Sequence, residues 1–440
     1  MKRTPRLGHF CRPVSRRARR ILGTMLLISA SITLIACEAP ASGLDGGRAE
    51  HPLAYQVDYL VTPQPARGGA SVVLTVSQPR RLLREIDMQI GAIDTSSVIA
   101  DGGYSLNGRR LVWNPPDNGG VLRWFVPIAN FRSEDTYDAY IDYAWALFRA
   151  EDIIPRARSR TLKGATSITR IKFDLPDGWS SNTEYFGRNN DYSVANPTRR
   201  FDQPTGWILL GNLGVRIDDI AGTRVIVAAP VAHGARRLDI LALLQWTLPE
   251  LKRVLPDFPA RLTVMSAAGP MWRGGLSAPA SLFIHADLPL ISENGTSTLL
   301  HEVLHIGLDL RAAEGADWII EGLAEFYGLE LLKRTNTISV TRHSAAIEKL
   351  RAWGSDAKNL CRKQSTGPVT AQATAIFHAL DLELRSNNEK NVTYSLDDLL
   401  PILQANESKV TVEDLQNAAR QLVGFLPTAI ESKNLPGCAE

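Results

Sequence analysis

Hydrophobic and polar positions follow two different patterns along this chain. From residue 52 to about 229, short alternating or β-branched runs predict strands, and clusters rich in Asp, Asn and Gly between them predict turns. The clearest of these runs lie at 71–76, 110–113, 168–173 and 224–228. A β-sandwich is the simplest architecture for this pattern, so we predict a sandwich-like domain over 52–229.

The period changes to that of helices after residue 230. The sequence predicts helices at 238–255, 298–310, 317–333, 343–353, 370–386, 396–405 and 412–423, and strands at 260–266 and 280–285. The predicted fold class is therefore a multidomain α+β protein. An α+β domain over 230–335 follows the sandwich, and a helical domain over 336–440 follows that.

The first 36 residues have the layout of an export signal. Eight basic side chains precede an apolar run at 21–35, which is too short to span a bilayer well. The run ends in Leu-Ile-Ala-Cys, which resembles the lipobox of bacterial lipoproteins, where the cysteine, here Cys37, is acylated. An ordinary signal peptide with an incidental cysteine is the alternative. Residues 37–51 are small and polar, as expected of a flexible tether.

This resemblance implies a lipid anchor in the bacterial cell envelope, facing the periplasm. Glu38 follows the cysteine where an Asp commonly marks inner-membrane retention, so we expect the outer membrane. Loss of residues 1–36 removes eight basic and no acidic side chains, so the net charge changes from +3 to −5. No basic run remains, and we therefore expect no nucleic-acid partner.

Cysteine usage also fits export. Cys11 leaves with the signal and Cys37 would carry lipid, which leaves Cys361 and Cys438 as an even pair in an oxidising compartment. We predict a disulfide between them. It would connect the end of the chain to the helical domain.

The strongest chemical signal is the HExxH sequence from His301 to His305. Residues four apart lie on one face of a helix, so both imidazoles can reach one Zn²⁺, while the carboxylate of Glu302 can reach a water on the metal. The same five letters also arise by chance in ordinary structural helices. A second signal is therefore needed.

A second predicted helix supplies the additional evidence for a zinc site. Catalytic zinc takes three protein ligands and keeps one open position, and Glu321 in the following predicted helix is the candidate third ligand. Glu325, one turn further, could accept a hydrogen bond from a histidine and fix its tautomer. Asp309 could do the same. The alternative for Glu325 is a solvated or salt-bridged side chain, and the alternative for Asp309 is an ordinary acid at the end of a helix.

Together, HExxH and the Trp-x-x-Glu-Gly segment that contains Glu321 resemble the gluzincin peptidases, in particular the glycyl aminopeptidase family and its relative, the aminopeptidase N family. Further stretches at 144–155, 381–385 and 395–399 are similar to that family, as is Gly274-Gly275-Leu276, which resembles its substrate strand. The resemblance implies a thermolysin-like catalytic domain, a Zn²⁺ cofactor, and a peptide or protein substrate.

Two departures from the family concern substrate binding and catalysis. The family usually has a glutamate and then a histidine after Gly-Gly-Leu, and that glutamate helps to bind a free amino group, but Ser277 and Ala278 occupy these positions here. The family's tyrosine, which stabilises the tetrahedral intermediate, is also missing at Val369 and Thr370. Exopeptidase and endopeptidase activity therefore both remain open.

The sequence favours a zinc-dependent peptidase at the bacterial cell envelope, with Glu302 activating the water on the metal. Two alternatives remain. One is a catalytically inactive peptidase-like lipoprotein that binds an envelope partner, which the two departures favour. The other is a zinc hydrolase that acts on a non-peptide substrate.

Overall fold

A computed structural model describes residues 53–195, 201, 203–386, 392–406 and 408–438. The predicted signal at 1–36, the lipidation site Cys37 and the tether at 37–51 lie outside the described residues. In the part of the chain that is described, no helix combines the length and the apolar character needed to cross a membrane.

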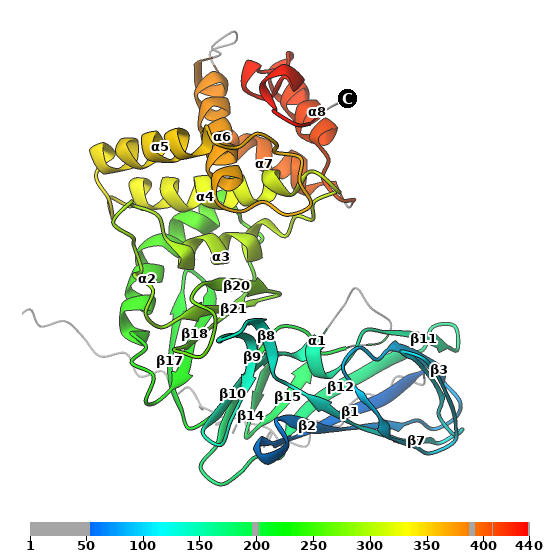
Figure 1. The fold of residues 1–440 in the computed structure, drawn as a ribbon. Helices are drawn as coiled ribbons and strands as arrows, with labels where there is room; N and C mark the ends of the chain where they lie inside the picture. Colours follow the sequence, from blue (N-terminus) through cyan, green and yellow to red (C-terminus); the bar gives the residue numbers. More distant parts are fainter. Residues whose placement is uncertain (1–52, 196–200, 202, 387–391, 407, 439–440) are drawn as a thin grey trace, which may run out of the picture. The chain divides into compact units, whose positions relative to one another are not determined.

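The N-terminal region consists of β-sheets (Figure 1). Strand β1 (Ala54–Gln64) shows why: Tyr55, Val57, Tyr59 and Val61 alternate with more exposed residues, so one face of the strand is buried. The seven-stranded sheet has the order β14-β15-β12-β1-β2-β7-β4. Its other strands are β2 (Gly69–Ser77), β4 (Asp94–Ala100), β7 (Gly119–Pro127), β12 (Thr166–Phe173), β14 (Phe186–Arg188) and β15 (Asp191–Val194).

Two smaller sheets complete this region, and side chains of all three sheets share one hydrophobic core. The five-stranded sheet contains β13 (Ser180–Asn182), β16 (Trp207–Gly211), β10 (Trp145–Arg149), β9 (Thr136–Ile141) and β8 (Asn130–Ser133), in that order. The four-stranded sheet contains β11 (Ala157–Thr161), β3 (Leu83–Gln89), β6 (Arg110–Asn114) and β5 (Gly103–Asn107). Short helices are η1 (Pro65–Arg67) and α1 (Ala150–Ile153).

A fourth sheet of five strands follows the N-terminal sheets. Its order is β17-β18-β19-β21-β20, formed by β17 (Leu213–Ile220), β18 (Thr223–Pro230), β19 (Arg261–Ala267), β21 (Ser281–His285) and β20 (Gly275–Ala278). β18, β19 and β21 are parallel, and β20 is an antiparallel edge strand. The boundary predicted between residues 229 and 230 falls inside β18. Strand periodicity does not reveal which sheet a strand joins, so the sequence placed β17 and most of β18 in the N-terminal domain.

The central strands β18, β19 and β21 of the fourth sheet are buried on both faces. Val225, Val227 and Val264 face a core shared with the helices, whereas Met265 and Phe283 face a core shared with Trp145 and Trp207 of the five-stranded sheet. Burial on both sides explains the nearly continuous apolar runs in these strands. The sheet therefore lies between the helices and the N-terminal strands.

Helices form the rest of the molecule (Figure 1). They are α2 (Arg237–Val254), α3 (Thr298–Leu308), α4 (Asp317–Arg334), α5 (Val340–Gly354), α6 (Pro368–Ser386), α7 (Leu396–Gln404), α8 (Val412–Val423), η2 (Thr428–Ile430) and η3 (Ser432–Asn434). These bounds agree with the predicted helices to within a few residues. The multidomain α+β fold class is confirmed.

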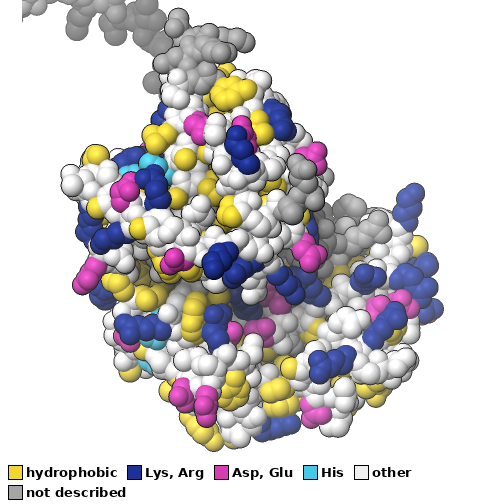
Figure 2. Space-filling view, turned by 45° about the horizontal axis from the view of Figure 1, so that its top comes forward, with side chains coloured by type: hydrophobic (Ala, Val, Ile, Leu, Met, Phe, Trp, Pro, Cys, Tyr) yellow, Lys and Arg dark blue, Asp and Glu magenta, His cyan; other side chains and the backbone are white. Residues whose placement is uncertain are grey.

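Two further features concern cross-links and surface charge. Cys361 and Cys438 are joined by a disulfide, with their Cα atoms 5.0 Å apart. On the face shown in Figure 2, acidic and basic side chains are interspersed with apolar ones.

A buried carboxylate stabilises the helical region. Glu330 on α4 is 3% exposed, and its oxygens lie 2.6 Å from Lys333 Nζ, 3.0 Å from His343 Nε2 and 3.4 Å from Arg334 Nε. Burial alone would raise the pKa of Glu330, but these cationic and hydrogen-bonding partners lower it to about 2.

We predict that Glu330→Gln destabilises the fold above pH 4.5 and has little effect near pH 2. The carboxylate has a lower pKa in the folded state, so its stabilisation is complete above the unfolded value of 4.5 and is lost as the pH falls through about 2. A shift of this size corresponds to about 3 kcal/mol. Urea unfolding of both proteins at several pH values measures the difference.

The matched control is Glu348→Gln on α5, since Glu348 belongs to an exposed ion pair with Arg351. It should cost under about 1 kcal/mol at any pH. A Glu330→Gln difference that did not depend on pH would contradict the proposed role of the ionised carboxylate.

Candidate metal centre

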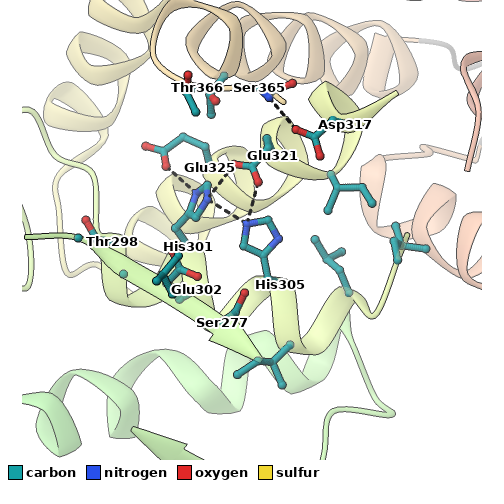
Figure 3. A pocket seen from close by; sticks show the side chains of 18 of the residues that line it. Ser277, Thr298, His301, Glu302, His305, Asp317, Glu321, Glu325, Ser365 and Thr366 are labelled. Carbon is teal, nitrogen blue, oxygen red and sulfur yellow. Dashed lines mark hydrogen bonds and ion pairs between the residues drawn. The ribbon is translucent and has the colours of Figure 1, made fainter. Parts of the chain in front are cut away.

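Helix α3 presents the two histidines of HExxH. Its N-terminus is capped by Ser297, whose hydroxyl accepts a hydrogen bond from the N–H of Leu300. Leu299 and Val303 are buried in the core shared with the sheet. One side of the helix is thus fixed by packing, and His301 and His305 are left to face a cleft (Figure 3).

Helix α4 brings the third predicted ligand to the same point. Nε2 of His301 and Nε2 of His305 are 3.0 Å apart. Nε2 of His301 lies 3.2 Å from Oε2 of Glu321, and Nε2 of His305 lies 3.3 Å from Oε1 of the same carboxylate. Candidate ligand atoms of these three residues all lie within 4.8 Å of one another. The two helices therefore place two nitrogens and a carboxylate around one small space (Figure 3).

This spacing fits zinc. Ligands about 2.0–2.1 Å from a tetrahedral Zn²⁺ are separated from one another by roughly 3.3 Å, close to the distances found here. Two imidazoles and one carboxylate also match the ligand set of catalytic zinc sites, which leaves a fourth position open to the cleft. The donor set fits the metal by geometry and by chemistry.

The electrostatics of the site favour a cation. Burial alone would raise the pKa of Glu321, but hydrogen bonds from His301 and His305 lower it to about 2. Burial alone would lower the pKa of His301, but Glu321 and Glu325 raise it well above its ordinary value. The surrounding carboxylates thus favour positive charge at the point where the two rings meet.

Glu325 contacts the outer nitrogen of one histidine. Its Oε2 lies 3.0 Å from Nδ1 of His301, so Nδ1–H can donate to the carboxylate while Nε2 faces the metal position. Asp309, the other acid considered for this task, lies just beyond α3 in a left-handed conformation with φ 44°. Among the hydrogen bonds and ion pairs of the described residues, Glu325 is the only partner of the outer nitrogen, Nδ1, of either His301 or His305.

Glu302 lies against the edge strand β20. It is 8% exposed and lines the same cleft as the histidines. A Cβ added at Gly275 would lie 2.7 Å from Cγ of Glu302 and 2.9 Å from Cγ2 of Thr298. The strand can approach Glu302 this closely because position 275 has no side chain.

The cleft has a volume of about 1720 Å³ and is lined by several segments. They include all of the Gly-Gly-Leu stretch, then Ser277 and Ala278, and on the opposite side residues 364–367 and Thr370. In the described part of the chain no tyrosine lines the cleft; the hydroxyl of Tyr327 instead donates to Asp397 at 3.1 Å.

Sequence reasoning gave no role to two arginines of the N-terminal region that also line the cleft, Arg132 and Arg149. Arg149 lies within a stretch that resembles the peptidase family, and that was the only available signal. Arg149 on β10 contacts Ser277 on the edge strand β20, and the two residues are 128 positions apart in the sequence. No local pattern predicts such a contact.

Comparison with known proteins gives structural matches only. No protein-family model matches the chain, and no curated protein matches it in sequence. Among solved structures, an M1 zinc metallopeptidase from Deinococcus radiodurans matches with a TM-score of 0.60 and 14% identity, over 88% of this chain and 94% of its own.

Two further structures match at the same identity of 14%. An aminopeptidase N family protein from Idiomarina loihiensis has a TM-score of 0.59, over 87% of this chain and 74% of its own. Aminopeptidase A of Legionella pneumophila, in complex with aspartic acid, has a TM-score of 0.51, over 84% and 48%. The matches show that this chain has the fold of these proteins.

We predict that Glu325→Gln weakens Zn²⁺ binding roughly 10- to 100-fold, because a neutral amide holds His301 less firmly in the metal-binding tautomer. Competition with a chelator of known affinity measures the change. Glu314→Gln, in the exposed turn between α3 and α4, is the control and should bind Zn²⁺ as the wild type does. Equal affinities of all three proteins would rule out this role for Glu325.

Proposed function

We propose that this chain, which shares its fold with M1 zinc metallopeptidases, is a zinc-dependent peptidase. The observation that supports this most directly is the meeting of His301, His305 and Glu321 within hydrogen-bonding distances, beside Glu302, in a cleft bordered by an edge strand. The cleft is large enough for a peptide, and the related Deinococcus protein has been solved as a mutant bound to a Tyr-Ser-Ala substrate.

His301, His305 and Glu321 would hold the metal. When bound, Zn²⁺ supplies a Lewis acid that polarises a carbonyl and lowers the pKa of water to about 7. Glu325 keeps the His301 ring in place through Nδ1. The remaining steps fall to side chains and backbone groups of the cleft.

Glu302 is the proposed general base. Its carboxylate would accept a proton from the attacking water and then donate it to the amine that leaves as the peptide bond breaks. β20 is an edge strand next to Glu302, so an extended peptide can pair with its open side and be held beside that carboxylate.

The proposed location is the bacterial cell envelope, with the folded part facing the periplasm. The supporting features are the export-type N-terminus, the lipobox-like sequence that ends at Cys37, and Glu38 after it, which favours the outer membrane. The disulfide between Cys361 and Cys438 suits an oxidising compartment.

A catalytically inactive protein that binds an envelope partner is the second candidate. It is favoured by the absence of a cleft-lining tyrosine among the described residues. Such a protein would capture the same partner with or without Glu302, and it would cleave no peptide.

We expect Glu302→Gln to keep about one Zn²⁺ per chain and to lose peptide cleavage by roughly 10²- to 10⁴-fold, because it removes the proton acceptor but none of the proposed ligands. Elemental analysis and cleavage of a peptide library with blocked and free ends measure both properties. Glu314→Gln controls for the loss of one carboxylate. If neither wild type nor variant cleaves any peptide, the binding function is favoured instead.

We expect Gly275→Ala to lower kcat/KM by about 10- to 100-fold, because the new methyl group would displace the carboxylate of Glu302 or the edge strand. Gly328→Ala on α4 is the matched control, since its nearest neighbour would be 4.0 Å away. That variant should keep full activity and gain a little stability from its better helix propensity. Unchanged activity of Gly275→Ala would contradict the placement of Glu302 against this strand.

A further inference from the structure

Alternate residues of β20 direct their backbone N–H and C=O groups toward the open edge of the sheet, the side of β20 that is not paired with β21. The N–H of His285 on β21 donates to the carbonyl of Gly274 at 3.0 Å, and the register of the two strands places these residues opposite each other. Hydrogen bonding to a neighbour alternates along an antiparallel strand. Gly274 and Leu276 therefore pair with β21, whereas Gly275 and Ser277 point their N–H and C=O groups to the open edge.

Arg149 occupies the Ser277 end of this edge. Its Nη2 donates to the carbonyl of Ser277 at 3.4 Å, and its guanidinium lies 5.0 Å from the ring centre of Trp207. Trp207 also donates through Nε1 to the carbonyl of Leu276 at 2.9 Å. The end of β10 is thus joined to β20 at the place where a substrate strand would continue past Glu302.

The charge of Arg149 is not neutralised by an ion pair among the described residues, although the side chain is half-buried. Glu151 and Asp152 interact electrostatically with Arg149, but neither forms an ion pair with it: Glu151 accepts from the N–H of Gly206, and Asp152 accepts from the backbone N–H of Arg149 itself. Arg132, the other cleft arginine, is paired with Asp138 at 2.6 Å. Among the described residues the guanidinium therefore has no carboxylate in direct contact, and its N–H groups can bind a carboxylate of a substrate.

We propose that Arg149 binds an anionic group of the substrate at the Ser277 end of β20, so that the enzyme selects acidic peptides and does not require a free amino terminus. The inference rests on the proposed peptidase function. A strand advances about 3.3 Å per residue, so the anionic group belongs to a residue within about two positions of the cleaved bond. A substrate ammonium group at this place would meet a like charge.

The test uses zinc-loaded protein and peptides that are acetylated and amidated at their ends, with Asp, Asn or Lys at each position near the cleaved bond. Wild type should cleave the best Asp peptide with a kcat/KM about 10- to 100-fold above its Asn counterpart, as expected for a charge-assisted hydrogen bond. Arg149→Gln should remove this preference, so that Asp and Asn peptides are cleaved with similar kcat/KM. Arg149→Lys should keep part of it.

Arg132→Gln is the matched control, because it removes a positive charge from the same cleft, but one that Asp138 already neutralises. It should keep the preference for Asp. A second set of peptides with a free C-terminal carboxylate and no acidic side chain identifies the source of the anionic group. Preference for that set alone would assign the subsite to a terminal carboxylate, whereas preference for internal Asp assigns it to a side chain.

A measurement of peptide binding tests the Arg149 subsite separately from the proposed peptidase activity. Calorimetry of the same Asp and Asn peptides with Glu302→Gln protein, with and without Arg149→Gln, measures the subsite even when no bond is cleaved. An Asp preference that disappears with Arg149→Gln supports the subsite, and absence of cleavage by wild type would then overturn only the peptidase function. Equal binding of Asp and Asn peptides, or equal losses for both on Arg149→Gln, overturns the subsite.

Discussion

The structure depends on holding three groups with electron pairs, two imidazoles and a carboxylate, within about 3 Å of one another. Such an arrangement is unfavourable unless a cation or shared protons lie between them. Packing prevents it from relaxing, since α3 is buried against the fourth sheet and α4 is buried along most of its length. The hydrophobic core therefore supplies the free energy that keeps the metal ligands together.

The fourth sheet connects this centre to the N-terminal region. Its central strands are buried on both faces, and its edge strand β20 pairs on one side with β21 and is contacted at its end by Arg149 and Trp207. Residues on β10 and β16 thereby contribute to the cleft next to Glu302. The β region is part of the site and not only a support for it.

Much of this could be predicted from the sequence, and the limits have physical causes. Helices such as α2 and α8 were recognisable from their period. The pairing of His301 with His305 was predictable because spacing within one helix sets their distance. Glu321 lies on a second helix, and it was identified by the motif around it rather than by a local distance. Membership of β17 and β18 in the fourth sheet was not predictable, since the β17–β18 hairpin joins that sheet through the pairing of β18 with β19, which lies beyond helix α2 in the sequence. The same holds for Arg149, whose role depends on a contact with Ser277 rather than on its neighbours in sequence.

The disulfide has a consequence for the cleft. Cys361 lies three residues before the segment 364–367 that forms one cleft wall, and the N–H of Ser365 in that segment donates to Asp317 at the start of α4. This wall is therefore held by two attachments, the disulfide to Cys438 and the hydrogen bond to Asp317. A reducing environment would free one of these two attachments, so the oxidation state of the compartment helps to set how firmly the wall opposite β20 is held.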